Sequence, residues 1–111
     1  RWMMFLATSV YGCDLRLFYP ERFTTNEAET PGIKAKAEAM MSRDFDIYAE
    51  ALGDRLFMLG RFTALDLYAA MMVSWAPDLG ALLVKHPNLS AMYKAVTDMP
   101  MVKAVWVRNG L

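Results

Sequence analysis

The pairing of Thr63 with Asp66, just ahead of an apolar run that ends at Trp75, most constrains how this chain can fold. Thr63 is suited to cap a helix with its side-chain oxygen, and Asp66, at the third helical position, can accept a hydrogen bond from the amide of Thr63. Phe62 can then pack on Leu67 as a hydrophobic staple. The pattern predicts a buried helix that begins at a structural capping box.

The remaining segments carry helix signals separated by prolines and glycines, and none reads as a convincing strand. We expect an apolar helix over residues 1–19, with a kink or a close approach at Gly12, and a connection over residues 21–32. A long amphipathic helix is expected over residues 33–52, packed through Ala37, Met40, Met41, Asp44, Phe45, Tyr48 and Leu52. Shorter segments follow over residues 79–85, 88–99 and from Pro100 onward.

These signals predict an all-α protein, an orthogonal or up-and-down helical bundle of five to six helices, with residues 1–111 as a single helical domain. The chain has 111 residues, of which 56% are hydrophobic and 22% charged, and its formal net charge is zero. This composition suits a domain that can bury a core. Without a run of either charge, no nucleic-acid partner and no membrane partner is expected.

The residues that usually carry catalysis are scarce. His86 is the only histidine and Cys13 the only cysteine, so neither a metal-ligand cluster nor a nucleophile with its base can be assembled from them. We expect no metal and no catalytic residue in this chain. His86, before Pro87, is interpreted as a surface residue at a helix start, and Cys13 as a small packing group, with reactivity as the alternative. A single cysteine suits a cytoplasmic protein.

The order of these features resembles the helical C-terminal domain of glutathione S-transferases, especially the bacterial members. The segment from Gly60 to Asp66, followed by an apolar helix that closes on Trp75, is similar to the capping box of that domain. The segments His86–Leu89 and Met99–Val102 are similar to the Pro-Asn-Leu helix start and the final helix of the family. The resemblance covers essentially the whole chain. One departure is Leu65, where the family usually has Ala before the boxed Asp.

The resemblance implies a division of labour. A thioredoxin-like N-terminal domain, which these 111 residues do not contain, would bind the co-substrate glutathione and stabilise its thiolate. The helical domain would supply much of the pocket for a small hydrophobic electrophile. The chain alone is therefore expected to be inactive, and conjugation is expected only when it is joined to that other domain, with detoxification as the associated role. A homodimer of the full-length protein is also implied, with Met4, Met40, Met41, Arg43, Asp44 and Asp46 on the two helices that build the dimer contact.

Three residues are candidates for the hydrophobic pocket by the same resemblance. Tyr11 and Gly12 match positions that face the pocket, and Trp75 matches a tryptophan that lines it. The neighbours Gly12 and Asp14 indicate an exposed or interfacial turn around Tyr11. A core position is the alternative for Trp75, because it closes an apolar helix.

Two other functions stay open. The chain could be a non-catalytic interaction or dimerisation module of the same fold, which predicts an exposed apolar patch. It could also be a stand-alone binder of small molecules or a stress protein, an alternative supported by its apolar content and its aromatic residues.

Overall fold

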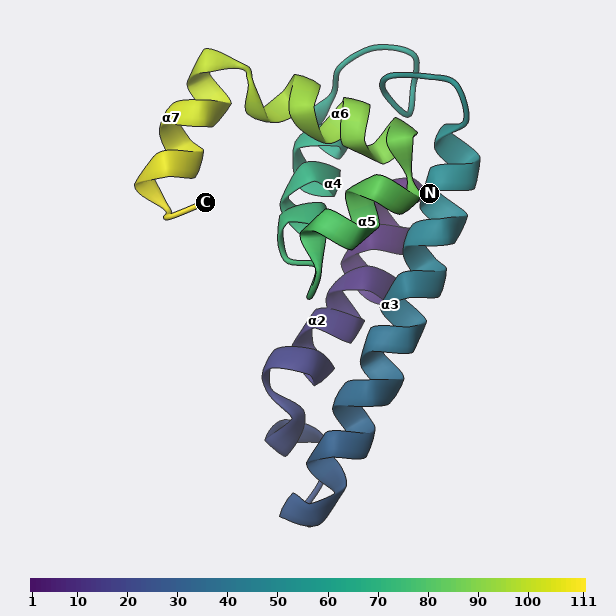
Figure 1. Ribbon diagram of the computed structural model, residues 1–111, viewed down its shortest axis with the longest axis vertical. Coiled ribbons are helices and arrows are strands. Elements are labelled where there is room, and N and C mark those ends of the chain that lie inside the picture. The colour runs from purple at the N-terminus through teal and green to yellow at the C-terminus, as the bar shows by residue number, and fades with distance from the viewer. The chain divides into compact units, whose positions relative to one another are not determined.

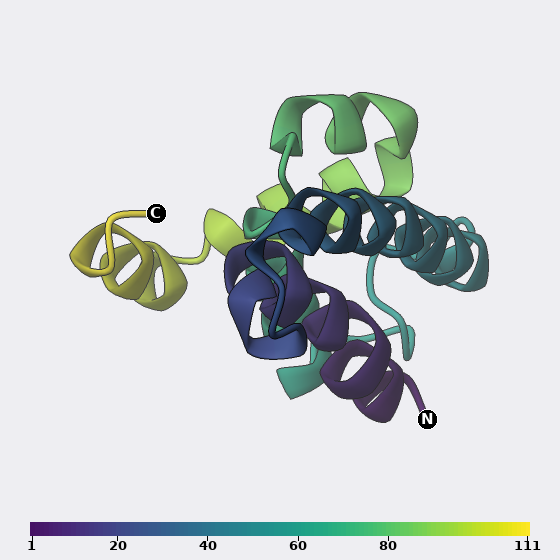
Figure 2. The ribbon, with the colours of Figure 1, turned by 90° about the horizontal axis from the view of Figure 1, so that it is seen from below.

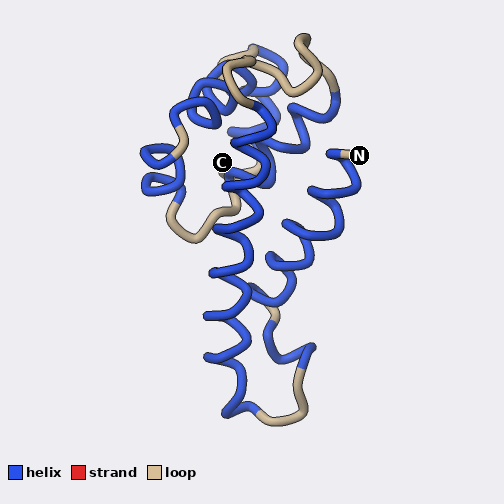
Figure 3. The backbone as a smooth tube through the Cα atoms, turned by 90° about the vertical axis from the view of Figure 1, so that its right-hand side faces the viewer, coloured by secondary structure: helices blue, strands red, loops and turns tan.

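Helices are the only regular secondary structure in the computed structural model, which describes residues 1–111 (Figures 1 and 3). The elements are α1 (Trp2–Phe5), the π-helical η1 (Leu6–Val10), α2 (Tyr11–Phe18), the 3-10 turns η2 (Pro20–Phe23) and η3 (Glu27–Glu29), α3 (Thr30–Leu52), α4 (Ala64–Ser74), α5 (Leu79–Lys85), α6 (Pro87–Thr97) and α7 (Pro100–Arg108). Because α1, η1 and α2 follow one another without a break, the chain forms six helices. The all-α prediction and the predicted number of helices are confirmed.

Contacts divide the chain into two compact units, unit 1 (Arg1–Tyr48) and unit 2 (Ala49–Leu111), and α3 crosses the boundary. The prediction of one domain over residues 1–111 stays a prediction.

In unit 1 the helix from α1 to α2 lies beside α3 (Figures 1 and 2). Buried side chains recur at helical spacing on both, as expected for two amphipathic helices that share a core. They are Leu6, Val10, Cys13 and Leu17 on the first helix and Ala37, Met41, Asp44, Phe45 and Tyr48 on the second. Met40, predicted for the packed face, is exposed instead, because the buried stripe steps from Ala37 to Met41 and leaves Met40 at its edge.

A close approach, one of the two features expected at Gly12, is present there. The π-helical segment η1 interrupts the regular helix just before Tyr11, which places the irregularity a few residues ahead of Gly12. Nη1 of Arg16 donates a hydrogen bond of 2.8 Å to the carbonyl oxygen of Gly12. A Cβ atom at Gly12 would lie 3.2 Å from that nitrogen, so the glycine makes room for the folded-back guanidinium.

The helix α3 begins at Thr30, three residues earlier than the sequence pattern suggested. Pro31 fits in the first turn of α3 because amide hydrogens in the first turn of a helix have no acceptor within that helix. A residue without an amide hydrogen therefore loses no helical hydrogen bond there. Ahead of Thr30, the side chain of Asn26 accepts a hydrogen bond from the amide of Ala28 at 3.1 Å, and η3 leads directly into the helix. The expected connection is thus largely ordered as short turns.

In unit 2 the predicted capping box is present at the start of α4. Oδ2 of Asp66 accepts a hydrogen bond of 2.8 Å from the amide of Thr63, and the hydroxyl of Thr63 accepts one of 3.3 Å from the amide of Leu65. Asp66 is fully buried, and its other oxygen, Oδ1, accepts a bond of 3.1 Å from the amide of Met58. The ring of Phe62 meets that of Phe57 edge-on at 5.6 Å.

The start of α6 is fastened to the end of α3 by Asn88. Its Nδ2 donates hydrogen bonds to the carbonyl oxygens of Ala49 at 2.7 Å and Gly53 at 3.1 Å. Gly53 has a φ of +58°, a conformation that ends the helix and that suits glycine. Pro87 and Pro100 occupy the first turns of α6 and α7, as predicted.

We predict that Asp66→Ala lowers the free energy of unfolding by about 3 kcal/mol, because two amides lose their buried acceptor. Asp78→Ala is the matched control. Asp78 accepts from the amide of Ala81 at 2.9 Å but is exposed, so its loss should cost about 1 kcal/mol or less. Urea denaturation of both variants measures the two values. Equal, small losses would show that Asp66 is an ordinary cap.

Candidate functional site

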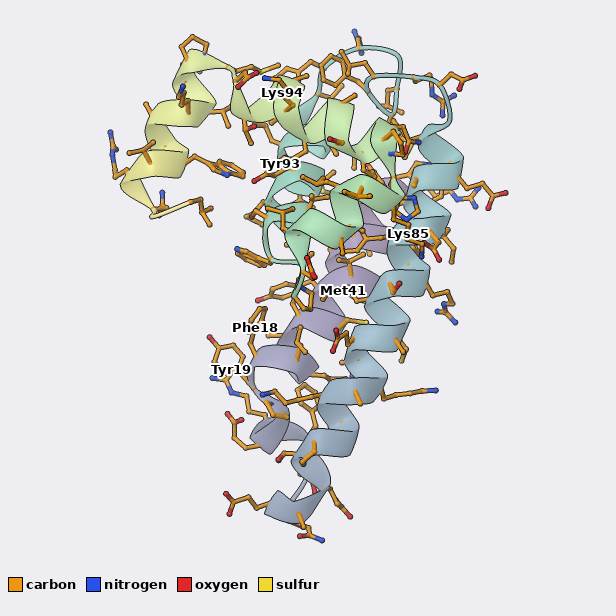
Figure 4. The ribbon with its side chains drawn as sticks, in the orientation of Figure 1. Phe18, Tyr19, Met41, Lys85, Tyr93 and Lys94 are labelled. Carbon is orange, nitrogen blue, oxygen red and sulfur yellow. The ribbon has the colours of Figure 1, made fainter.

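Tyr11 and Gly12 lie in the first turn of α2, in unit 1. Tyr11 is 37% exposed, while Gly12 is half-buried beside the guanidinium of Arg16. Within unit 1, Figure 4 shows the rings of Phe18 and Tyr19 directed away from α3, at the other end of α2. Tyr11 is therefore accessible enough to contact a ligand. Gly12, which has no side chain, leaves space for the guanidinium of Arg16.

Trp75 is half-buried at the C-terminal end of α4, in unit 2. It lines a cavity of about 360 Å³ between α4 and α7. The other lining residues are Met71, Val105, Trp106, Asn109 and Leu111. A cavity walled by two indole rings, a thioether and aliphatic groups suits a small apolar or aromatic molecule.

A second apolar cavity, of about 520 Å³, also borders Trp106. It is lined by Leu67, Met101, Val102, Ala104, Val105, Trp106 and Arg108. Nε1 of Trp106 is buried without a hydrogen-bond partner, which is unusual for an indole in a folded protein. The sequence predicted the helix α7 but gave no signal that its apolar side chains would leave cavities against α4.

The predicted pocket residues thus belong to different units: Tyr11 and Gly12 to unit 1, Trp75 to unit 2. A pocket that all three would line stays a prediction.

Unit 1 also contains a buried carboxyl group that sequence reasoning missed. Asp14 is 2% exposed, so it does not share the exposure that was predicted for the turn around Tyr11. Neither of its carboxyl oxygens has a hydrogen-bond partner, and burial raises its pKa to about 7. The only available signal was its position between Cys13 and Leu17, two residues of the apolar stripe, and a single aspartate at such a position does not reveal burial.

Cys13 packs against Asp44 on α3. Its Sγ lies 3.9 Å from Oδ2 of Asp44, which is itself buried, and Oδ1 of Asp44 is 3.2 Å from Nη2 of Arg43. Burial, and then the carboxylate of Asp44, raise the pKa of the Cys13 thiol. Because a thiol must ionise to act as a nucleophile, this environment favours the interpretation of Cys13 as a packing group.

His86 is half-buried at the N-cap position of α6, so it occupies a helix start as predicted. No group of three or more His, Cys, Asp or Glu side chains is placed to hold a metal ion. None of the helices combines the length and the apolar character needed to cross a bilayer.

No family model, no curated protein and no solved structure matches this chain. The glutathione S-transferase resemblance therefore depends on the sequence features given above.

We predict that Asp14 makes stability fall as pH rises. Its folded-state pKa of about 7 lies above the ordinary 3.8, so the folded protein binds the proton more tightly. The resulting stabilisation is complete below about pH 4 and is lost as the pH rises through about 7. Asp14→Asn should therefore gain stability relative to the original protein between pH 5 and pH 8, by on the order of 2 kcal/mol.

Thermal unfolding at the two pH values measures this difference. Asp98→Asn serves as the control, because Asp98 is exposed, pairs with Lys94 at 2.6 Å and has a lowered pKa. It should leave the difference between pH 5 and pH 8 unchanged. If Asp14→Asn is no more stabilising at pH 8 than at pH 5, the carboxyl of Asp14 is hydrated.

Proposed function

We propose that this chain is the C-terminal helical domain of a glutathione S-transferase-like protein, in which it forms the hydrophobic pocket for the electrophile. The observation that carries the proposal is the position of Trp75. The resemblance assigns Trp75 to the wall of a substrate pocket, and Trp75 lines an apolar cavity of about 360 Å³. The capping box and the proline-initiated helices α6 and α7 further support the likeness to that domain.

The chemistry available to this chain is binding rather than activation. Conjugation requires the thiolate of glutathione, and a thiolate is stabilised by donors aimed at the sulfur. In the longer protein, a thioredoxin-like domain would supply those donors and bind glutathione as co-substrate. The indole of Trp75 offers a flat apolar surface that can orient an aromatic electrophile and exclude water. Tyr11, which the same resemblance assigns to substrate binding, would modulate substrate choice.

The full-length protein would act in the cytoplasm as a homodimer, with α1, α2 and α3 contributing to the dimer contact. Met4 is 64% exposed and Met40 is also accessible, so both can contact a partner subunit. Met41 and Asp44, expected in the same contact, are buried within the chain and pack its own core. The dimer contact would therefore use the outer face of α3.

Conjugation of glutathione to 1-chloro-2,4-dinitrobenzene tests the proposal. The assay compares the 111-residue chain with the same chain joined to whatever its gene encodes upstream of Arg1. We expect activity only in the longer protein. Inactivity of both, with a helical circular dichroism spectrum retained, would contradict a transferase role.

Two substitutions in the active longer protein locate the pocket. We predict that Trp75→Leu raises the KM for the aromatic electrophile about tenfold while leaving the KM for glutathione nearly unchanged, because a large aromatic contact surface contributes on the order of 1.5 kcal/mol. Tyr11→Phe should change turnover or substrate choice with glutathione affinity unchanged. Trp2→Leu, outside the cavity, is the control. Equal effects of Trp75→Leu and Trp2→Leu would place the pocket elsewhere.

The alternative, a non-catalytic interaction module, is favoured by one observation. The helix α7 has no fully buried residue, and its apolar side chains are prominently accessible: Met101 is 83% exposed, and Val105 and Val107 are also exposed. An exposed apolar patch of this kind commonly marks an interaction surface. A folded, inactive longer protein that binds a partner through α7 would support this second function.

A further inference from the structure

Unit 1 contains a groove that the proposed substrate pocket does not use. It lies between the last turn of α2, the turns η2 and η3, and the first three turns of α3, and its volume is about 710 Å³. Sites for small molecules typically measure roughly 300–1,000 Å³. The groove therefore has room for a small ligand.

Apolar residues line the groove, and exposed charged residues form its rim. Phe23, Ile33 and Met40 supply the apolar surface. Two cations, Arg16 and Lys36, stand at the rim. Apolar surface with a few charged groups at the edge is the arrangement that orients an amphipathic ligand.

Arg16 is held in place before any ligand arrives. It donates one hydrogen bond to the carbonyl oxygen of Gly12, and its guanidinium lies over the ring of Phe23, 4.9 Å from the centroid. A guanidinium has five N–H donors, and only one of them has a protein acceptor here. The remaining donors are available to an anion at little conformational cost.

The charges at the rim favour an anion. Lys36 is exposed and forms no ion pair with the protein. Glu29 is the one acidic lining residue, and its carboxylate accepts a hydrogen bond from the hydroxyl of Thr24. Two cations against one partly occupied carboxylate leave a net positive rim.

Gly32 borders the groove without a side chain. It lies in the first turn of α3 among the lining residues, and a Cβ atom built there would meet nothing within 4 Å. Its backbone does not require glycine, since it is not among the glycines with positive φ. Any larger residue at this position would add helix propensity, by about 1 kcal/mol for Ala, and would occupy the groove.

We propose that this groove binds a small amphipathic anion, with an apolar or aromatic body on Phe23, Ile33 and Met40 and a carboxylate or sulfonate between Arg16 and Lys36. The site lies within unit 1 and involves neither Trp75 nor the cavities beside α7. Its existence is independent of whether the chain belongs to a transferase.

Titration of the 111-residue chain with 1-naphthoate, followed by ¹H–¹⁵N NMR spectra, tests the proposal. We expect chemical-shift changes to centre on Arg16, Ile33 and Lys36, and we expect 1-naphthalenemethanol, which has the same ring without the charge, to bind at least threefold more weakly. Lys36→Gln should weaken naphthoate about threefold, as expected for one exposed charge pair, and the effect should shrink at high salt. Lys34→Gln is the matched control on the same helix, outside the groove, and should change nothing.

Gly32→Met provides a test that does not depend on charge. It should remove naphthoate binding while the circular dichroism spectrum and the melting temperature are retained. Three results would each overturn the proposal: equal affinity for the naphthoate and the alcohol, equal effects of Lys36→Gln and Lys34→Gln, or unchanged binding in a folded Gly32→Met variant.

Discussion

The buried carboxylate of Asp66 joins two segments that would otherwise be independent. One oxygen accepts from the amide of Thr63 at the start of α4, and the other from the amide of Met58 in the loop before it. A buried amide without an acceptor costs as much as a lost hydrogen bond, so the loop and the helix are stabilised only together. The helix α4 then presents Ala69, Met72 and Val73 to the core and ends at Trp75, the residue on which the proposed pocket depends.

Local interactions made much of the fold predictable. The capping box is decided by residues three positions apart, and Pro87 and Pro100 mark first turns because each lacks an amide hydrogen. These elements were predicted correctly. The start of α3 was placed too late because Pro31 and Gly32 resemble a connection, although both are compatible with a first helical turn.

Features that depend on packing were not predictable from the pattern. Asp14 is buried because of how other parts of the chain pack on α2. Met40 is exposed because the adjacent Met41 takes the buried position on α3. The groove beside Arg16 forms because the chain turns back through η2 and η3. No sequence motif predicts that turn. Tyr11, Gly12 and Trp75 were proposed by resemblance, and only for Trp75 does the structure add a cavity.

Amide hydrogen exchange, followed by NMR, tests most directly whether Asp66 organises unit 2. Met58 and Thr63 lie outside regular helices, and the amides of such residues normally exchange quickly. If the carboxylate of Asp66 holds both, their amides should exchange as slowly as those in the middle of α4, through opening of the whole unit. Fast exchange at Met58 and Thr63, with α4 still protected, would show that the helix stands without the loop and would contradict the account.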